Sequence, residues 1–566
     1  MNILGISFLS DASACILRDG YLVAAMSEER LNREKLWFGV PHRAIAEVLK
    51  IAGLQLDEID FIATHGQAPL EPERAPYEAK ERDIRAAGLS AAVRDEKIKA
   101  LWSRFSHESM VFSQRTPQYL AQIAQLGRPM KIYGHHQSHA ATAYYGSPYA
   151  DAMVLTADGW GEDASSTLWR CKDLKMERIA RSNTFDSLGY FYGSITKALD
   201  FIPHRHEGKV LGLAAYCPEP KSYKQIRQLV DVLPKEGRFI GRLESSSYLP
   251  RFENPDLKKL IAEFSREDIA AATQKTLEEV VTALVSAQGS AARHLCVAGG
   301  IFANVKLNQR LADLKNVEEI FVFPNMGYGG LGVGAAWLAY VEETGKRPQL
   351  FRTAYLGHDP SDREISEAVS QSGLTHRREE NIAEAIAEFL AKDVVVARCT
   401  GAMEFGPRAL GHRSILYHAK DASVNNWLNE RLNRSEFMPF APATLAEEAP
   451  RFYRNLEVSG AAASYMTVTC DCTAEMRSQA PAAVHVDGTA RPQLVSATGN
   501  PDFHAILLGY RARTGLCSVI NTSFNMHEEP IVCTAEDAVR AFRASGIGVL
   551  ALGDFIVHSA EGIMPR

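Results

Sequence analysis

Apolar and polar positions in the first 64 residues predict short strands and one amphipathic helix. Three strands are expected at residues 2–7, 12–18 and 21–27, with Asp19-Gly20 as the turn between the last two. A helix over residues 41–52 and a strand over 59–64 follow. Because the intervening run 28–35 is rich in charge, we interpret it as a solvent-exposed helix start.

The pattern becomes charged and helical from Glu71 to Arg115, a stretch that we interpret as an insertion or lid. A strand at 131–133, a helix from His135, a buried strand over 152–157 and a long amphipathic helix over 267–290 are expected next. Residues 345–360 are rich in breakers and are interpreted as a linker before a second part.

The size and charge of the chain exclude several classes of protein. With 566 residues, two to four domains are expected. A net charge of −6 supplies no overall basic face for a polyanion, so no nucleic-acid partner is expected. Nine scattered cysteines fit a reducing cytoplasm. No basic leader and no apolar run of spanning length is seen, so neither a signal peptide nor a membrane partner is expected.

His135 and His139 are candidate metal ligands, since a separation of four residues puts both on one face of a helix. Asp158 follows the apolar run 152–157 and meets a glycine turn, where a carboxylate can point into a cleft. Two imidazoles and one carboxylate suit a divalent transition ion with positions left open for substrate. The alternative is that the histidines cap the helix or pack beneath a sheet. Asp158-Gly159 favours the metal only modestly.

Several glycine turns are candidate phosphate sites. Lys209 precedes a helix start of small residues, where a phosphate could meet backbone N–H groups, although a surface lysine is an equally good interpretation. Gly299 and Gly300 follow a strand and allow close approach of a nucleotide, and Asn304 can hydrogen-bond a ribose or phosphate. A second such turn lies at 324–334, and neither is a Walker or Rossmann motif.

The second part of the chain places polar side chains on several predicted loops. Arg408 and Arg413 are bracketed by glycines in the run 401–413 and suit bidentate phosphate contacts. Arg434, Asn521 and Ser523 lie on later loops. Together these residues are what an anion-activating site requires.

Seven ordered motifs make the chain resemble the NodU/CmcH-type carbamoyltransferase family over nearly its whole length. They are His135-His-Gln-Ser-His139, Asp158-Gly159, Gly208-Lys-Val-Leu-Gly-Leu-Ala-Ala215, Ala298-Gly-Gly300 with Asn304, Phe405-Gly-Pro-Arg-Ala-Leu-Gly-His-Arg413, Pro439-Phe-Ala-Pro442 and Asn521-Thr-Ser-Phe-Asn525. The resemblance implies an α/β protein in which an amino-terminal, two-lobed actin-like domain (1–350) precedes a YrdC-like domain (351–566).

The resemblance also implies a reaction and its ligands. The YrdC-like domain would make carbamoyladenylate from carbamoyl phosphate and ATP with Mg²⁺, and the actin-like domain would transfer the carbamoyl group to a hydroxyl. Carbamoyl phosphate and ATP would be bound by Arg408, Arg413, Arg434, Asn521 and Ser523. The intermediate would be lined by Lys35, Lys209, Gly299, Gly300 and Asn304. Fe²⁺ or another divalent transition metal would be held by His135, His139 and Asp158.

Three positions depart from the family pattern. Ser10-Asp11 stands where the family carries His-Asp, and Tyr328 stands where it carries an acidic fourth metal ligand. A phenol with a pKa near 10 is a poorer ligand unless the metal deprotonates it. The basic residues before Pro439 are reduced to Arg434, with Met438 beside the proline.

The leading hypothesis is therefore an ATP-dependent O-carbamoyltransferase acting on a small hydroxylated acceptor, a sugar or a specialised metabolite. Asp11 and Glu207 are candidates for orienting or deprotonating the acceptor. The alternatives are a carbamoyladenylate enzyme directed at tRNA and a regulatory nucleotide-binding module that has lost its metal ligand. The sequence leaves the acceptor and the oligomeric state open, with a homodimer as one option.

Overall fold

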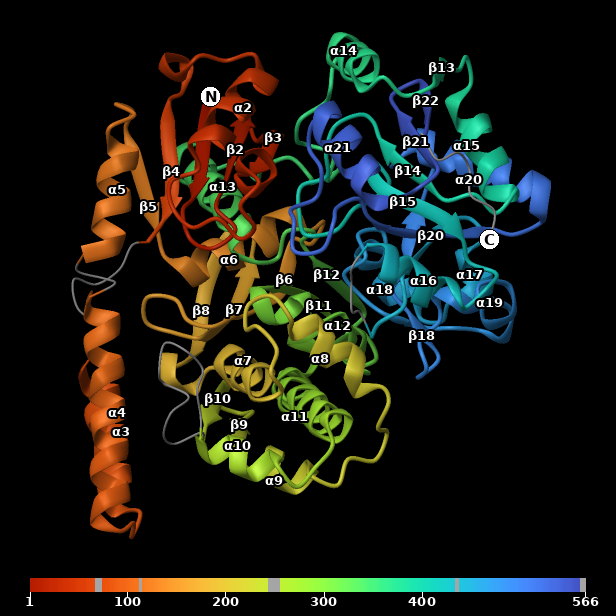
Figure 1. Ribbon diagram of the computed structural model, residues 1–566. Helices are drawn as coiled ribbons and strands as arrows, with labels where there is room; N and C mark the ends of the chain where they lie inside the picture. Colours follow the sequence, from red (N-terminus) through yellow and green to blue (C-terminus); the bar gives the residue numbers. More distant parts are fainter. Residues whose placement is uncertain (67–73, 111–113, 243–254, 433–436, 560–566) are drawn as a thin grey trace. The chain divides into compact units, whose positions relative to one another are not determined.

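The protein, seen in a computed structural model, has an α/β fold, which confirms the predicted class (Figure 1). The structure describes residues 1–66, 74–110, 114–242, 255–432 and 437–559. The chain forms two compact units: residues 1–6 with 59–348, and residues 7–58 with 349–566. The predicted domains, 1–350 and 351–566, stay a prediction.

The central sheet of the first unit has the order β12-β11-β6-β7-β8. Its strands are β6 (Asp151–Ala157), β7 (Ser166–Lys172), β8 (Lys175–Ser182), β11 (His294–Ala298) and β12 (Glu319–Val322). β6, β11 and β12 run parallel, with Val154 opposite Cys296. Because parallel strands end at one edge of a sheet, Asp158 after β6 and Gly299 after β11 come to the same edge.

A second set of parallel strands leads into the helix that carries the candidate metal ligands. β1 (Asn2–Ser7) pairs with β4 (Phe61–His65), which pairs with β5 (Met130–Tyr133). Helix α6 (His135–Gly146) begins two residues after β5 and packs on α13 (Leu331–Thr344). Figure 1 shows α6 and α13 near the upper end of β6.

The remaining described elements of this unit are mainly helical. They are α3 (Arg74–Ala86), α4 (Ala91–Met110), α5 (Thr116–Ala124), α7 (Leu188–Ala198), α8 (Glu207–Ala214), α9 (Tyr223–Arg227), β9 (Val230–Leu233), β10 (Arg238–Gly241), α10 (Pro255–Ile261), α11 (Arg266–Ser286) and α12 (Val305–Ala312). The described part of the predicted insertion 71–115 is helical, as expected, and α3 and α4 lie along each other. The long helix predicted over 267–290 is α11.

The second unit contains an eight-stranded sheet in its described part, ordered β13-β22-β21-β14-β15-β20-β16-β19. Its strands are β13 (His376–Arg378), β14 (Val396–Cys399), β15 (Arg413–His418), β16 (Ala441–Leu445), β19 (Gln493–Val495), β20 (Ser518–Ser523), β21 (Val549–Leu552) and β22 (Phe555–His558). A small pair, β17 (Cys470–Asp471) and β18 (Thr489–Ala490), lies outside it. The helices are α14 (Asp362–Ser372), α15 (Ile382–Ala391), α16 (Val424–Arg431), α17 (Ala449–Phe452), α18 (Leu456–Ala463), α19 (Ala474–Gln479), α20 (Pro501–Thr514) and α21 (Ala535–Ser545).

An amino-terminal hairpin belongs to this second unit. β2 (Ser13–Arg18) and β3 (Tyr21–Ser27) pair in antiparallel fashion, as predicted, and lead to α1 (Glu29–Asn32) and α2 (His42–Ala52). The N–H of Ala25 donates to the Leu356 carbonyl at 3.0 Å, and that of Gln349 donates to Gly20 at 2.9 Å. These main-chain hydrogen bonds connect the amino-terminal hairpin to residues 349–356, which lie far from it in the sequence.

The expectation that residues 28–35 begin a solvent-exposed helix was wrong for its first three residues. Glu28, Glu29 and Arg30 are only 4%, 5% and 6% exposed. The Glu28 carboxylate accepts the backbone N–H of Ala44 at 2.7 Å and that of Arg43 at 3.3 Å, at the start of α2. Since orphan N–H groups at a helix start need acceptors, Glu28 has a structural reason to be buried.

In the described residues, no helix is long and apolar enough to cross a membrane.

Candidate metal centre and phosphate loops

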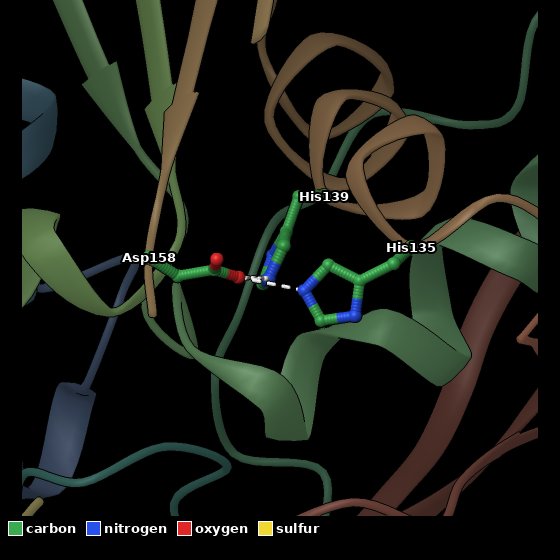
Figure 2. Close-up of side chains that lie close together, drawn as sticks. All are labelled: His135, His139 and Asp158. Carbon is green, nitrogen blue, oxygen red and sulfur yellow. Dashed lines mark hydrogen bonds and ion pairs between the residues drawn. The ribbon is translucent and has the colours of Figure 1, made fainter. Parts of the chain in front are cut away.

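His135, His139 and Asp158 converge from two elements of the first unit (Figure 2). The histidines lie on successive turns of α6, and Asp158 follows β6, where its N–H donates to the Ser165 carbonyl at 3.0 Å. Nε2 of His135 lies 2.6 Å from Oδ2 of Asp158, and Nε2 of His139 lies 3.2 Å from the same oxygen. One ligand atom from each residue lies within 4.8 Å of the others, so a single ion could be bound by all three.

The donor atoms of this cluster fit a metal ion. Nδ1 of His139 and Oδ1 of Asp158 are buried and have no hydrogen-bond partner among the described residues, and the 3.2 Å contact of His139 Nε2 with Asp158 lacks hydrogen-bond geometry. A buried polar atom without a partner is costly, and a bound cation would satisfy the Asp158 oxygen and one imidazole nitrogen. Two imidazoles and a carboxylate are typical ligands of a divalent transition ion, and three ligands leave coordination positions open.

Three buried neighbours support the cluster, and the sequence did not assign them. His136 is held by Thr156 Oγ1 at 2.8 Å and by the Ala164 carbonyl at 2.9 Å. Oε1 of Glu162 accepts the backbone N–H of His135 at 2.5 Å, at the start of α6. The ring of His65, at the end of β4, meets His135 edge to face at 6.0 Å. His136 and Glu162 lie within the sequence motifs 135–139 and 158–163, which is a signal, whereas His65 lies in neither motif and meets His135 only in the fold.

The charges of the cluster are set by burial and by the Asp158 carboxylate. Burial lowers the pKa of His139 to about 4, so its imidazole is neutral at neutral pH. Burial also lowers the pKa of His135, but Asp158 and Glu162 together raise it above its ordinary value. Burial raises the Asp158 pKa, yet the histidines lower it well below its usual range. A neutral imidazole and an ionised carboxylate are the forms that bind metals.

Two glycines let the Asp158 turn pack closely against its surroundings. A Cβ on Gly161 would lie 2.8 Å from the His136 ring and 3.0 Å from the His135 ring. A Cβ on Gly189, in the first turn of α7, would lie 2.5 Å from the Asp158 carbonyl. Ser187 Oγ also donates to that carbonyl at 3.0 Å. Residues 158–161 are therefore held from two sides.

Tyr328 lies at the edge of the cluster. Its ring centroid is 5.3 Å from that of His135 and 6.1 Å from that of His139. Burial, and then the Asp158 carboxylate, raise the pKa of the phenol well above its ordinary value. Without a metal the phenol is therefore protonated at neutral pH, as a hydroxyl beside the three candidate ligands.

The candidate phosphate residues of the first unit have distinct surroundings. Lys209 on α8 is 6% exposed, which argues against the alternative of a surface lysine. Gly299 has a φ of +103°, and a Cβ there would lie 2.2 Å from the Ala157 carbonyl, whereas a Cβ on Gly300 would meet no atom within 4 Å. Asn304 caps α12 through the N–H of Leu307 and exchanges two amide hydrogen bonds with Gln274 on α11. α8 and α12 both pack on α11.

Glu207, a candidate base, begins α8. Its Oε1 accepts the backbone N–H of His204 at 2.6 Å, and burial raises its pKa. In the second unit, Asp11 has a left-handed backbone with a φ of +62°. Burial, and then the Glu29 carboxylate, raise its pKa to about 8, against the opposing effect of Arg30. Lys35 is half-buried on the segment after α1.

Arg408 and Arg413 differ sharply in their surroundings. Arg408 is half-buried in the loop between Phe405 and Leu410. The guanidinium of Arg413 is fully buried and donates to five main-chain carbonyls at 2.6 to 3.3 Å; they belong to Thr400, Gly401, His358, His412 and Cys533. These contacts give Arg413 a role in organising the backbone, and its predicted phosphate contact stays a prediction.

The other predicted residues of this unit lie on or near β20. Asn521 is buried, and its amide donates to Gln493 Oε1 at 2.7 Å and to the Ala409 carbonyl at 3.2 Å. Ser523 ends β20 opposite Ser414. Asn521 therefore contacts the residue after Arg408. Arg434 lies outside the described residues.

A carboxylate that the sequence did not single out organises the Arg408 loop. Oε1 of Glu404 accepts the N–H groups of Leu410 at 2.7 Å, His412 at 2.9 Å and Arg413 at 3.2 Å. Glu404 is 5% exposed. Such a cluster of backbone donors around one oxygen fixes the path of the chain after Arg408.

The fold and these sites are those of an α/β protein with a candidate metal centre and an arginine-bearing loop, and comparison with known proteins identifies its family. The model described as carbamoyltransferase N-terminus matches residues 2–337, and that described as carbamoyltransferase C-terminus matches residues 387–559. The chain therefore belongs to the carbamoyltransferase family, which confirms the predicted resemblance and the enzyme class.

Relatives align along most of the chain. Nodulation protein NolNO of Sinorhizobium fredii is 30% identical, over 97% of this chain and 79% of its own length. Nodulation protein U of Rhizobium tropici is 26% identical, over 93% and 91%. An uncharacterized protein of Synechocystis is 30% identical, over 98% and 96%. Among solved structures, HypF of T. kodakarensis gives a TM-score of 0.36 at 12% identity, over 62% of this chain and 49% of HypF, which supports no inference. The predicted actin-like and YrdC-like folds stay predictions.

Proposed function

We propose that the chain is an ATP-dependent O-carbamoyltransferase, which makes carbamoyladenylate from carbamoyl phosphate and ATP and transfers the carbamoyl group to a hydroxyl of a small acceptor. The observation that carries this proposal is the buried cluster of His135, His139 and Asp158 within the carbamoyltransferase N-terminus match. A sugar or a specialised metabolite is the acceptor class that we propose, with an actin-like first domain and a YrdC-like second domain.

The activation step forms a mixed anhydride from a poor electrophile. Hydrolysis of carbamoyl phosphate releases phosphate and leaves carbamate, whose oxygen attacks the α-phosphorus of ATP and displaces pyrophosphate. The attack brings anionic groups together, so it needs fixed positive charge. Arg408 supplies a guanidinium on a loop that Glu404 holds, inside the carbamoyltransferase C-terminus match. Arg408 therefore supports the activation step electrostatically, and this contribution does not depend on the metal.

The transfer step needs a polarised carbonyl and an oriented acceptor hydroxyl. A divalent transition ion, such as Fe²⁺, held by His135, His139 and Asp158 would act as a Lewis acid on the carbamoyl carbonyl or the leaving phosphate. Glu162 accepts the backbone N–H of His135, Nε2 of His136 lies 3.7 Å from Oδ1 of Asp158, and Lys209 places a buried cation on α8. Asp11, with a pKa of about 8, and Glu207 are candidate bases for the hydroxyl.

The activation step can be tested alone. The full chain is incubated with carbamoyl phosphate, ATP and Mg²⁺ without acceptor, and pyrophosphate and carbamoyladenylate are followed by mass spectrometry. We expect both products from the wild type and from Arg363→Met, whose side chain is 85% exposed, and both products at a much lower rate from Arg408→Met. Folded protein that binds ATP but makes neither product would contradict the proposal.

A further inference from the structure

The short helix α1 reaches the loop that carries Arg408 through one buried guanidinium. Nη1 of Arg30 lies 3.0 Å from Oε1 of Glu29, and Nη2 donates to the Gly406 carbonyl at 3.0 Å. Arg30 is 6% exposed, so both contacts are shielded from water. The guanidinium fork therefore joins a carboxylate on α1 to the main chain two residues before Arg408.

α1 is itself fixed on both sides. Oε2 of Glu29 accepts the N–H of Leu36 at 2.7 Å. The guanidinium of Arg33 donates to the carbonyls of Pro530 and Ile531, both at 2.7 Å. Arg30 thus acts from a rigid support, because its ion-pair partner and the end of its helix are both anchored.

The loop between Phe405 and Leu410 is held on both sides of Arg408. Arg30 binds the Gly406 carbonyl before Arg408, and Glu404 binds the Leu410 N–H at 2.7 Å after it. Gly406 has a φ of +140°, a conformation that glycine adopts readily and other residues rarely do. Since glycine restrains its peptides little, the hydrogen bond from Arg30 helps to fix this carbonyl.

We propose that Arg30 is a positioning residue for Arg408, holding the Gly406 carbonyl so that the Arg408 guanidinium meets the phosphates. This inference rests on the proposed function, in which Arg408 binds carbamoyl phosphate and ATP. A hydrogen bond from a charged donor is stronger than one between neutral groups, so this contact favours one loop conformation. The side chain of Arg30 does not itself contact substrate in this proposal.

A double-mutant cycle tests the proposal. The KM for carbamoyl phosphate in pyrophosphate release is measured for Arg30→Met and Arg408→Met, alone and together. We expect Arg30→Met to raise the KM about tenfold in the wild-type background and less than about twofold beside Arg408→Met, because residues that act as a unit are not additive. Arg363→Met is the control and should leave the KM unchanged.

Equal effects of Arg30→Met in both backgrounds would overturn the proposal, since Arg30 would then act independently of Arg408. An unchanged KM in Arg408→Met alone would instead contradict the proposed function, on which the inference depends. The two failures are distinguished by Arg408→Met alone, which still raises the KM in the first case and leaves it unchanged in the second.

Hydrogen exchange provides a test that does not depend on activity. Arg30→Lys keeps the charge but loses the fork that spans Glu29 and Gly406. We expect faster exchange in the peptide covering residues 405–412, with unchanged exchange in α20 of the same unit. Unchanged exchange at 405–412, or an equal increase in α20, would overturn the positioning role.

Discussion

His135 Nε2 and Asp158 Oδ2 lie 2.6 Å apart, and both side chains are almost completely buried. This pair joins the first turn of α6 to the end of β6, and His139 completes the cluster from the next turn. A buried charge persists only with a partner, so the pair fixes the carboxylate at the place where a cation would be needed.

Substitution of Gly161 should disturb the cluster without removing any ligand. Because a Cβ would lie 2.8 Å from the His136 ring, Gly161→Ala must displace either the turn or the ring. We expect about 1–3 kcal/mol of destabilisation and a weaker affinity for transition metal, measured by thermal unfolding and by metal titration. Gly460→Ala is the control, since a Cβ there meets no atom within 4 Å. Equal metal affinity in the wild type and Gly161→Ala would contradict the packing argument.

Asp11 should make the folded state less stable as the pH rises. Its pKa is raised from 3.8 to about 8 on folding, so the folded state holds a proton that the unfolded state releases. Its favourable contribution is full below pH 3.8 and is lost as the pH rises towards 8. Asp11→Asn should therefore gain in Tm relative to the wild type between pH 5 and about 8. A Tm difference that does not change with pH would argue against a raised Asp11 pKa.

Arg413 and Arg408 should respond differently to the same substitution. Arg413→Met removes the guanidinium that donates to buried and partly buried main-chain carbonyls, and an unpaired buried group costs about 1–3 kcal/mol. We expect a Tm fall of many degrees for Arg413→Met, and a much smaller fall with a raised KM for carbamoyl phosphate in pyrophosphate release for Arg408→Met. A stable Arg413→Met chain that has lost only substrate affinity would instead place Arg413 at the phosphate.

The sequence predicted elements well where local pattern decides them. The spacing of His135 and His139, the turn after β6 and the hairpin at Asp19-Gly20 follow from local chemistry, and the structure has each of them. The prediction of a solvent-exposed helix start failed for Glu28, Glu29 and Arg30, because a run of charged residues is typical of an exposed helix face unless its partners are known. Those partners, Ala44 and Gly406, are 16 and 376 residues away.

The same limit applies to the candidate sites. Arg413 and Arg408 look equivalent in a glycine-rich run, and only the fold shows that one is surrounded by carbonyls. Glu162 and Glu404 act on backbone N–H groups, a function for which their local sequence gives no signal. Residue type and spacing therefore indicated which residues belong to the candidate sites. Burial and hydrogen-bond partners then showed which of them have a structural role.

Metal analysis of the purified protein tests the central claim most directly. The chain is prepared anaerobically with iron supplied, and transition metals are measured by mass spectrometry in the wild type, His139→Ala and His376→Ala, the last an exposed histidine as control. The account predicts stoichiometric metal in the wild type and the control, and at least about tenfold less retention in His139→Ala. Equal metal in His139→Ala, or none in the wild type, would contradict it.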